Sequence, residues 1–148
     1  MGATSERITQ ILAKMGIRAD VEERSIAEIS IPYINIATDE ARFLIGAQAR
    51  NLWALEYLSK RIIEREYPDV RGFFLDVNGY RLHYLEELKA EAKTVAKRVR
   101  LYRTELMLKP MPPFERRIVH MALAEYPDIT TQSVGEGEAR RVVVKPYP

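Results

Sequence analysis

The chain is 148 residues long, which suits one domain or two very small domains. Apolar residues make up 47% and charged residues 30%, a composition typical of a folded soluble protein rather than a disordered one. Cysteine is absent, which excludes disulfide scaffolds, thiolate zinc sites and cysteine nucleophiles, and only His83 and His120 could give imidazole to a metal site.

The sequence carries no mark of membrane insertion or export. No apolar run approaches the 18 residues of a membrane-spanning helix. Residues 1–6 lack the basic and apolar regions of a signal peptide. We therefore expect a cytoplasmic protein without membrane insertion, and no motif calls for a cofactor.

Positive charge gathers in one segment, although the net charge is only +2. Between Lys93 and Arg117 the sequence has eight basic and two acidic residues. Such an excess is typical of a surface that attracts a polyanion. A solvated helix face is the simpler alternative for this charge pattern taken alone.

Helix and strand signals alternate through the first half, at residues 5–15, 18–23, 26–33, 39–44, 49–65 and 72–77. Ser5 is placed to cap the first helix and Thr38 or Asp39 the second, while Pro32 should end the second strand. The longer helix should turn inward an apolar stripe of Leu52, Leu55, Leu58 and Ile62.

The second half should open with a long helix over residues 80–102, followed by a strand (105–109), a helix (114–122) and two strands (129–133 and 141–145). The inner stripe of the long helix should be Leu85, Leu88, Ala92, Val95, Val99 and Tyr102. Another face carries a basic stripe of Lys89, Lys93, Lys97 and Arg100. The helix dipole favours basic residues near that end even without a ligand.

The expected order is α-β-β-α-α-β, then the long helix, then β-α-β-β. This order predicts a mixed α+β chain of two lobes, residues 1–79 and residues 80–148.

Motifs of common enzymes are missing. The sequence has no G-x-S-x-G elbow, Walker A loop, H-E-x-x-H helix or G-x-G-x-x-G turn. A metal-dependent nuclease would need clustered carboxylates to hold its metal ion, and Glu136 with Glu138 in one loop is weak evidence for such a cluster. We therefore expect a protein that is not an enzyme.

Two local features suit phosphate. At residues 44–50 a helix, a glycine turn and the start of the next helix would offer unpaired N–H groups to an anion, although a plain helix corner has the same pattern. At residues 116–120, Arg116 and His120 are four apart and would project from one helix face as a phosphate clamp. The alternative is a surface pair in which His120 is capped or packed.

Together these segments resemble two known modules. The order α-β-β-α-α-β is similar to a KH domain, chiefly at residues 44–46, 55–58 and 74–80. The segment PMPPFERRIVH at residues 110–120 resembles the core of the R-x-x-x-H single-strand-binding domain, and residues 128–144 resemble its end. A KH domain followed by this module is the architecture of the bacterial Jag family, the SpoIIIJ-associated proteins, and the similarity covers residues 18–145.

The resemblance implies single-stranded RNA, or single-stranded DNA, as ligand and a small KH protein as partner. In a KH domain the G-x-x-G turn grips the backbone of about four nucleotides. Together with the basic stripe, the expected nucleic-acid contacts are Gly46, Ala47, Gln48, Ala49, Arg50, Lys93, Lys97, Arg100, Arg116, Arg117, His120, Thr131, Ser133, Arg140 and Arg141. Base preference should be modest, because no aromatic stacking platform resembles the RNP motifs.

The KH-like turn departs from the family pattern. Ala49 stands where the second glycine is usual, and Ala47 and Gln48 occupy positions that are often basic in the family. We expect Ala49 to cost little at a helix start and its methyl group to crowd a bound strand. This departure favours the rival hypothesis, an interaction adaptor whose KH half docks a protein and for which nucleic-acid binding is incidental.

Overall fold

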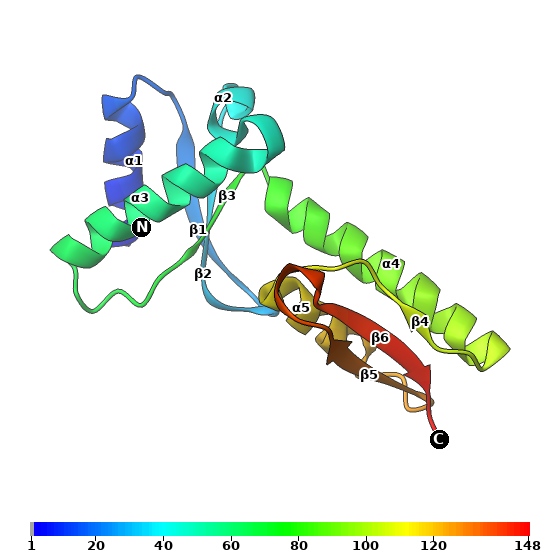
Figure 1. Ribbon diagram of the computed structural model, residues 1–148. Coiled ribbons are helices and arrows are strands. Elements are labelled where there is room, and N and C mark those ends of the chain that lie inside the picture. Colours follow the sequence, from blue (N-terminus) through cyan, green and yellow to red (C-terminus); the bar gives the residue numbers. More distant parts are fainter. Residues whose placement is uncertain (1) are drawn as a thin grey trace. The chain divides into compact units, whose positions relative to one another are not determined.

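Two hydrophobic cores form along the chain, one in each of two compact units. The computed structural model describes residues 2–148; the first unit ends at Leu82 and the second is His83–Pro148 (Figure 1). One helix, α4 (Tyr80–Tyr102), begins in the first unit and continues in the second. The mixed α+β class and the long helix predicted from the sequence are confirmed.

The first unit combines a three-stranded sheet with three helices. Its elements are α1 (Ala3–Lys14), β1 (Asp20–Ile26), β2 (Ile29–Ala37), α2 (Ala41–Ile45), a 3-10 turn η1 (Ala47–Ala49), α3 (Arg50–Glu66) and β3 (Phe74–Val77). The strand order is β1-β2-β3, with β1 antiparallel and β3 parallel to β2. Because side chains alternate along β2, Ile34 and Ile36 join the core with all three helices, whereas Tyr33 and Asn35 face the other side.

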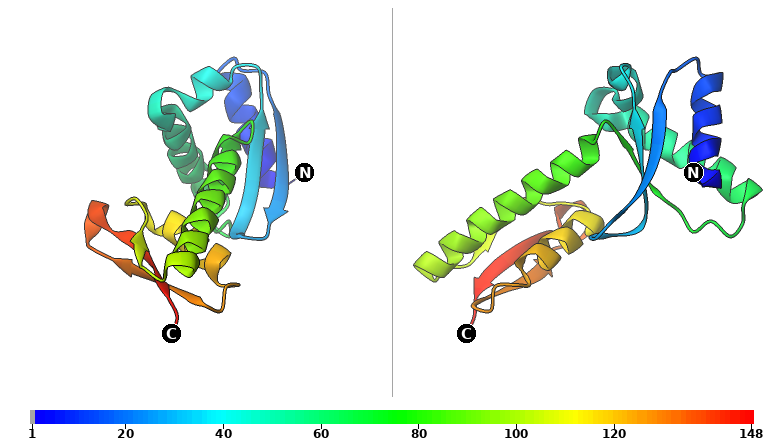
Figure 2. Two further views of the ribbon diagram at one scale, coloured as in Figure 1. Left: turned by 90° about the vertical axis from the view of Figure 1, so that its right-hand side faces the viewer. Right: turned by 180° about the vertical axis from the view of Figure 1, so that it is seen from behind.

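The second unit packs a small antiparallel sheet against α4 and one further helix (Figure 2). Its elements after α4 are β4 (Leu106–Met107), α5 (Pro113–Leu123), β5 (Ile129–Val134), a 3-10 turn η2 (Gly137–Ala139) and β6 (Arg141–Pro146), with strand order β4-β6-β5. The core consists of Leu88, Ala92, Ala96, Val99, Leu108, Met111, Val119, Leu123, Ile129, Val142 and Val144.

The expected helix caps of the first unit are wrong. Helix α1 begins two residues before Ser5, whose hydroxyl lies inside the first turn and donates to the Gly2 carbonyl at 3.0 Å. Helix α2 begins after Glu40 and has no side-chain cap. The Thr38 hydroxyl instead accepts from the Glu40 N–H at 3.1 Å and donates to the Arg18 carbonyl at 2.8 Å, which ties the helix entrance to the start of β1.

Pro32 does not end its strand, because β2 continues to Ala37. The β1–β2 register shifts between Arg24 and Ile26, so the proline lies in an irregular stretch. Parallel pairing with β3 begins only at Tyr33. The missing N–H of Pro32 therefore breaks no regular ladder bond, which is how a central strand tolerates proline.

Two expected core positions are exposed instead. Leu58 is 58% exposed, and the inward positions of α3 are Leu52, Leu55, Ser59 and Ile63. Ser59 is tolerated inside because its hydroxyl donates to the Leu55 carbonyl at 2.6 Å. In α4, Ala96 is buried, whereas Tyr102 in the last turn is 69% exposed.

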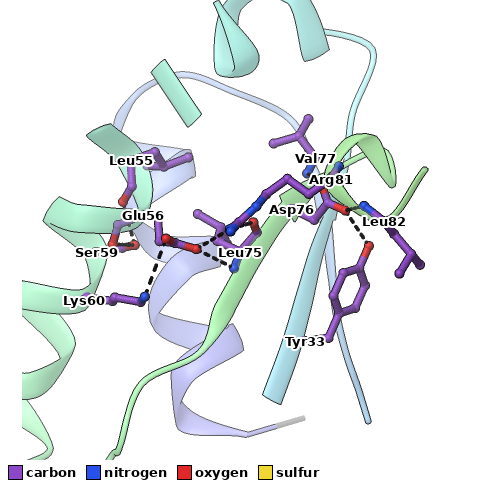
Figure 3. Close-up of polar contacts among 10 residues, drawn as sticks. All are labelled: Tyr33, Leu55, Glu56, Ser59, Lys60, Leu75, Asp76, Val77, Arg81 and Leu82. Carbon is purple, nitrogen blue, oxygen red and sulfur yellow. Dashed lines mark hydrogen bonds and ion pairs between the residues drawn. The ribbon is translucent and has the colours of Figure 1, made fainter. Parts of the chain in front are cut away.

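A buried carboxylate joins β3 to the first turn of α4. Asp76 is fully buried, and its oxygens accept from the Tyr33 hydroxyl at 2.8 Å and from the backbone N–H groups of Val77, Arg81 and Leu82 at 2.8, 2.8 and 3.0 Å (Figure 3). The N–H groups of a first helical turn have no intrahelical acceptor, so Asp76 serves them from the preceding strand. Burial and the bond to Asp76 raise the pKa of Tyr33, so its hydroxyl stays a donor.

We predict that Asp76→Ala lowers the free energy of unfolding of the first unit by about 3 kcal/mol, because two buried and two part-buried donors lose their acceptor. Urea denaturation followed by fluorescence of Trp53, the single tryptophan, measures the loss. The control Tyr33→Phe removes one of the four donors and should cost only about 1 kcal/mol. Equal losses in the two variants would contradict the role given to the carboxylate.

Candidate nucleic-acid interface

Helix α5 holds Arg116 and His120 at its surface. Ile118 and Val119 are buried and anchor the helix to the core, which leaves positions 116 and 120 half-buried on a neighbouring face. One Nη1 N–H of Arg116 donates to the Met111 carbonyl at 3.0 Å. This contact steadies the guanidinium but uses only one of its five N–H donors. No ion pair within residues 2–148 involves Arg116.

The imidazole of His120 lies between two hydroxyl groups of β5. Its Nδ1 is 2.7 Å from Thr131 Oγ1 and its Nε2 is 3.0 Å from Ser133 Oγ. Residues two apart on a strand share a face, so both hydroxyls reach the same ring. Burial, together with the positive charge of Arg116, lowers the pKa of His120 below its ordinary value.

This arrangement orients the hydroxyl protons. A neutral imidazole has one N–H donor and one acceptor nitrogen, so one hydroxyl donates to the ring and the other accepts from it. The accepting hydroxyl keeps its own proton free for a ligand. When the ring is protonated, both nitrogens donate, and both hydroxyl protons become free for an outside acceptor.

Arg140 and Arg141 hold the loop between β5 and β6. Arg140 donates to the Gly135 carbonyl at 2.7 Å, and Arg141 donates to the Ala139 carbonyl at 3.3 Å. Gly135 has a φ of +89°, and a Cβ there would lie 3.1 Å from the Ala139 carbonyl oxygen. The loop thus needs a glycine, and both guanidinium groups remain without a carboxylate partner among the residues that the structure describes.

The basic stripe of α4 is partly neutralised. Arg100 Nε lies 2.7 Å from Asp128 Oδ2, and this hydrogen bond lowers the pKa of the Asp128 carboxyl. Lys93 Nζ lies 3.9 Å from Glu125 Oε1. Within residues 2–148, Lys97 alone of the three expected contacts on α4 has no carboxylate partner. The acidic residues come from the segment after α5, a pairing that the spacing along α4 could not reveal.

The turn before α3 has an unusual backbone. Gly46 adopts φ +72° and ψ 179°, a region open almost only to glycine, and a Cβ there would lie 2.6 Å from Asn51 Cγ. The Asn51 amide donates to the Phe43 carbonyl at 2.7 Å, which closes the turn. The Arg50 guanidinium donates to Gln48 Oε1 at 3.2 Å.

The expectations for Ala49 are corrected by this backbone. Gln48 and Ala49 have φ values of +55° and +60°, so a left-handed conformation that costs an alanine about 1 kcal/mol occurs where little cost was expected. Ala49 is only 6% exposed and belongs to the core of the first unit. Its methyl group therefore packs inward, which offsets strain of the same order, and does not face a ligand.

Tyr84 and Lys109, which the sequence patterns did not single out, lie close to Glu115, the residue before Arg116. The Tyr84 hydroxyl donates to Glu115 Oε1 at 3.0 Å, and Lys109 Nζ lies 5.4 Å from the centre of the Tyr84 ring. Burial and the bond to Glu115 raise the pKa of Tyr84. Arg117 is exposed, with its guanidinium carbon 5.3 Å from the centre of the Phe114 ring. The spacing of three residues between Phe114 and Arg117 on a helix is the sequence signal that could have shown this contact.

An apolar groove of about 410 Å³ lies among α1, α2 and α3 of the first unit. Its walls include Met15, Phe43 and Leu58, which are 54%, 76% and 58% exposed. Ile11 and Ile62 contribute further apolar surface. A continuous apolar surface of this kind is typical of a contact site for another molecule.

No group of three or more His, Cys, Asp or Glu side chains among residues 2–148 could hold a metal ion. None of the helices in the same range combines the length and apolarity that a bilayer crossing requires.

Comparisons with known proteins bear on both units. Residues 86–146, within the second unit, match the family model of the R-3-H domain, which is named for its R-x-x-x-H motif. This match confirms the resemblance of that segment to the R-x-x-x-H module.

Three similar relatives each carry the name RNA-binding protein KhpB. The protein of Clostridium symbiosum is 30% identical over 139 residues, which are 94% of this chain and 63% of the relative. The proteins of Bacillus subtilis and Lactiplantibacillus plantarum are 35% and 29% identical over 112 and 144 residues, which are 74% and 96% of this chain and 54% and 44% of the relatives. The chain thus spans between 44% and 63% of the length of these relatives. It is similar to RNA-binding proteins of bacteria, and its residues 86–146 match the R-3-H domain.

Proposed function

We propose that this chain is a non-enzymatic, single-stranded RNA-binding protein of the Jag type, whose second unit holds the phosphate backbone. The observation that supports the proposal most strongly is a cluster of four polar side chains: Arg116, His120, Thr131 and Ser133. Each of them is held in place by a hydrogen bond to an uncharged group. Arg116 is half-buried and has only a carbonyl partner within residues 2–148, so no carboxylate neutralises its charge. The names of the relatives support RNA as the ligand.

The cluster suits a phosphate group by charge and by geometry. The remaining N–H donors of Arg116 form a planar fork that matches two phosphate oxygens. The hydroxyls of Thr131 and Ser133 add neutral donors, and His120 sets which of their protons are free. Arg117, Arg140 and Arg141 extend the positive surface, and Lys97 adds long-range attraction. Such contacts recognise the backbone and carry little information about base identity.

For the first unit we propose a KH-like role in which it contacts only the sugar–phosphate backbone of the bound RNA. The element order α-β-β-α-α-β supports the KH resemblance. The N–H groups around Gly46, Ala47 and Gln48 and the side chain of Arg50 are the proposed contacts, since the buried Ala49 leaves the surface of the turn open. Single-stranded DNA offers the same phosphates, so RNA and DNA are compared in each test below.

A second candidate function, a protein adaptor, is favoured by the apolar groove of the first unit. Lys14, Arg61 and Arg65 flank the groove-lining positions at helical spacing and form no ion pair with any residue from 2 to 148. A basic rim around an apolar groove fits an acidic amphipathic helix. The small KH partner that the family resemblance implies would have to present such a surface. An adaptor would show weak RNA binding that changes little with salt.

We predict that Arg116→Ala weakens binding of a 12-nucleotide single-stranded RNA about tenfold and lowers the slope of log affinity against log salt by about 0.7, because one phosphate contact is lost. Fluorescence anisotropy across a salt series measures both quantities. The control Arg65→Ala removes the same charge from the first unit and should change affinity less than about twofold.

Three results would contradict the proposal. RNA affinity that is weak and independent of salt in the unmodified protein would favour the adaptor. Equal losses in Arg116→Ala and Arg65→Ala would show that the cluster around Arg116 holds no phosphate. Shortening of the RNA on addition of Mg²⁺ would show a nuclease.

We predict that RNA affinity rises about threefold to tenfold as the pH falls from 8 to 6, because a bound phosphate favours the protonated ring of His120 and the extra donors it frees. Anisotropy at constant ionic strength measures the change. His120→Gln should remove the pH dependence, whereas the control His83→Gln, at an exposed histidine of α4, should keep it. The same slope in all three proteins would exclude His120 from the site.

The free protein should show the opposite trend in stability. Burial lowers the pKa of His120 in the folded state below the ordinary value of 6.5, so the unfolded chain binds more protons in that window. The contribution of His120 to stability is therefore present above pH 6.5 and is lost as the pH falls toward the folded pKa.

A further inference from the structure

Strand β3 forms an edge of the sheet in the first unit. It pairs only with β2, and the ladder continues through the Asn78 N–H, which donates to the Ile36 carbonyl at 2.9 Å. Because backbone groups alternate in direction along a strand, the N–H groups of Leu75 and Val77 point away from β2. Free groups on an edge offer hydrogen bonds to an added strand or to another planar polar ligand.

Side chains from the same unit occupy these edge groups (Figure 3). The Leu75 N–H donates to Glu56 Oε2 at 2.9 Å, and the Leu75 carbonyl accepts from Arg81 Nη1 at 2.9 Å. The Val77 N–H donates to Asp76 Oδ1 at 2.8 Å. Glu56 comes from α3 and Arg81 from the first turn of α4, so side chains from two helices bind the backbone of the same edge residue, Leu75.

The two side chains also bind each other. Arg81 Nη1 lies 2.6 Å from Glu56 Oε2, and the other carboxylate oxygen lies 3.5 Å from Lys60 Nζ. The side chains of Arg81 and Glu56 are only 14% and 13% exposed. The backbone N–H of Arg81 is held by Asp76, which fixes the point from which the guanidinium reaches. The ion pair is thus anchored at both ends.

Aromatic rings complete the surroundings of the guanidinium. Its central carbon lies 3.6 Å from the centre of the Phe74 ring and 4.4 Å from the centre of the Trp53 ring. Trp53 remains 50% exposed, whereas Phe74 is buried. The planar guanidinium over the rings donates to the Leu75 carbonyl, and the Glu56 carboxylate accepts from the Leu75 N–H. Together the two groups occupy the place that an unpaired nucleobase, with its own donor and acceptor, could take.

We propose that Glu56 and Arg81 determine the specificity of the first unit by closing the β3 edge, so that RNA meets it only through its backbone and bases are not distinguished there. The inference rests on the proposed RNA-binding function and deepens it. A base could reach Leu75 and the two rings only by displacing a mostly buried ion pair and separating Arg81 from its carboxylate, which is unfavourable. Phosphate contacts at the turn need no such displacement.

The test uses Trp53 as an internal reporter, because the chain has no other tryptophan. Anisotropy of labelled 12-nucleotide A, C and U homopolymers reports RNA binding by the whole chain, and Trp53 emission with unlabelled RNA reports stacking at the edge. The unmodified protein should bind the three RNAs within about threefold of one another, with a change in Trp53 emission below about one fifth.

Removing both charges together opens the edge and leaves only Lys60, whose side chain is partly exposed, without its carboxylate partner. In the double variant Glu56→Ala with Arg81→Ala, RNA should quench Trp53 strongly, and the affinities for the three homopolymers should differ about tenfold or more. The matched control is Arg7→Ala with Glu66→Ala, which removes another Arg–Glu pair of the same unit, 2.8 Å apart and away from the edge. This control should behave as the unmodified protein.

A conservative variant covers the case in which the double variant does not fold. Arg81→Lys keeps the positive charge but loses the planar group, so it should show partial quenching of Trp53 by RNA. Strong quenching of Trp53 by RNA in the unmodified protein, or no quenching in any folded edge variant, would contradict the proposal that Glu56 and Arg81 close the β3 edge. Neither result would contradict RNA binding by the chain. Absence of RNA binding in the anisotropy measurement would contradict the proposed function, and the inference would fall with it.

Discussion

Burial of the Asp76 carboxylate is the constraint on which the first unit depends. A fully buried carboxylate must find donors within the protein, and here they come from β2, from β3 and from the first turn of α4. This requirement sets where α4 starts, because its first N–H groups are the donors. It also sets where the side chain of Arg81 emerges, and with it the closed state of the β3 edge.

The need of a charged group for a partner also distinguishes arginines that already form an ion pair from an arginine that can bind an anionic ligand. Arg81 and Arg100 each have a carboxylate at 2.6 and 2.7 Å, so an anionic ligand would compete with an existing ion pair. Arg116 is held only by the Met111 carbonyl, which orients the group and leaves its charge uncompensated. Arg116 is therefore the arginine next to the hydroxyl pair of Thr131 and Ser133 whose charge is available for the proposed phosphate contact.

The sequence predicted local features well. The span of α4, residues 80–102, and the presence of α5 with Arg116 and His120 on one face followed from helical spacing and proline positions. Thr131 and Ser133 were expected only from the family resemblance, and the alternation of side chains along β5 places both hydroxyls on one side. These features depend on neighbours within a few residues, and such neighbours are visible in a single sequence.

What the sequence could not predict depends on partners far along the chain. Asp128 lies 28 residues after Arg100 and Arg81 lies 25 residues after Glu56, so no local pattern shows either pair. The left-handed backbone at Ala49 has a similar origin, since packing in the core overrides the preference of an alanine for other conformations. Ser59 occupies an inward position of α3 in place of the expected Leu58, and its hydroxyl is satisfied locally by the Leu55 carbonyl in the preceding turn.

The most direct measurement of the central claim is nitrogen-detected NMR of the His120 ring with backbone amide spectra of the whole chain, recorded as a short single-stranded RNA is added. The account predicts that Nδ1 and Nε2 of His120 shift together with the amides of residues 116, 131 and 133, saturating at one RNA per chain. Unchanged ring nitrogens, with all shifts confined to the apolar groove of the first unit, would contradict it.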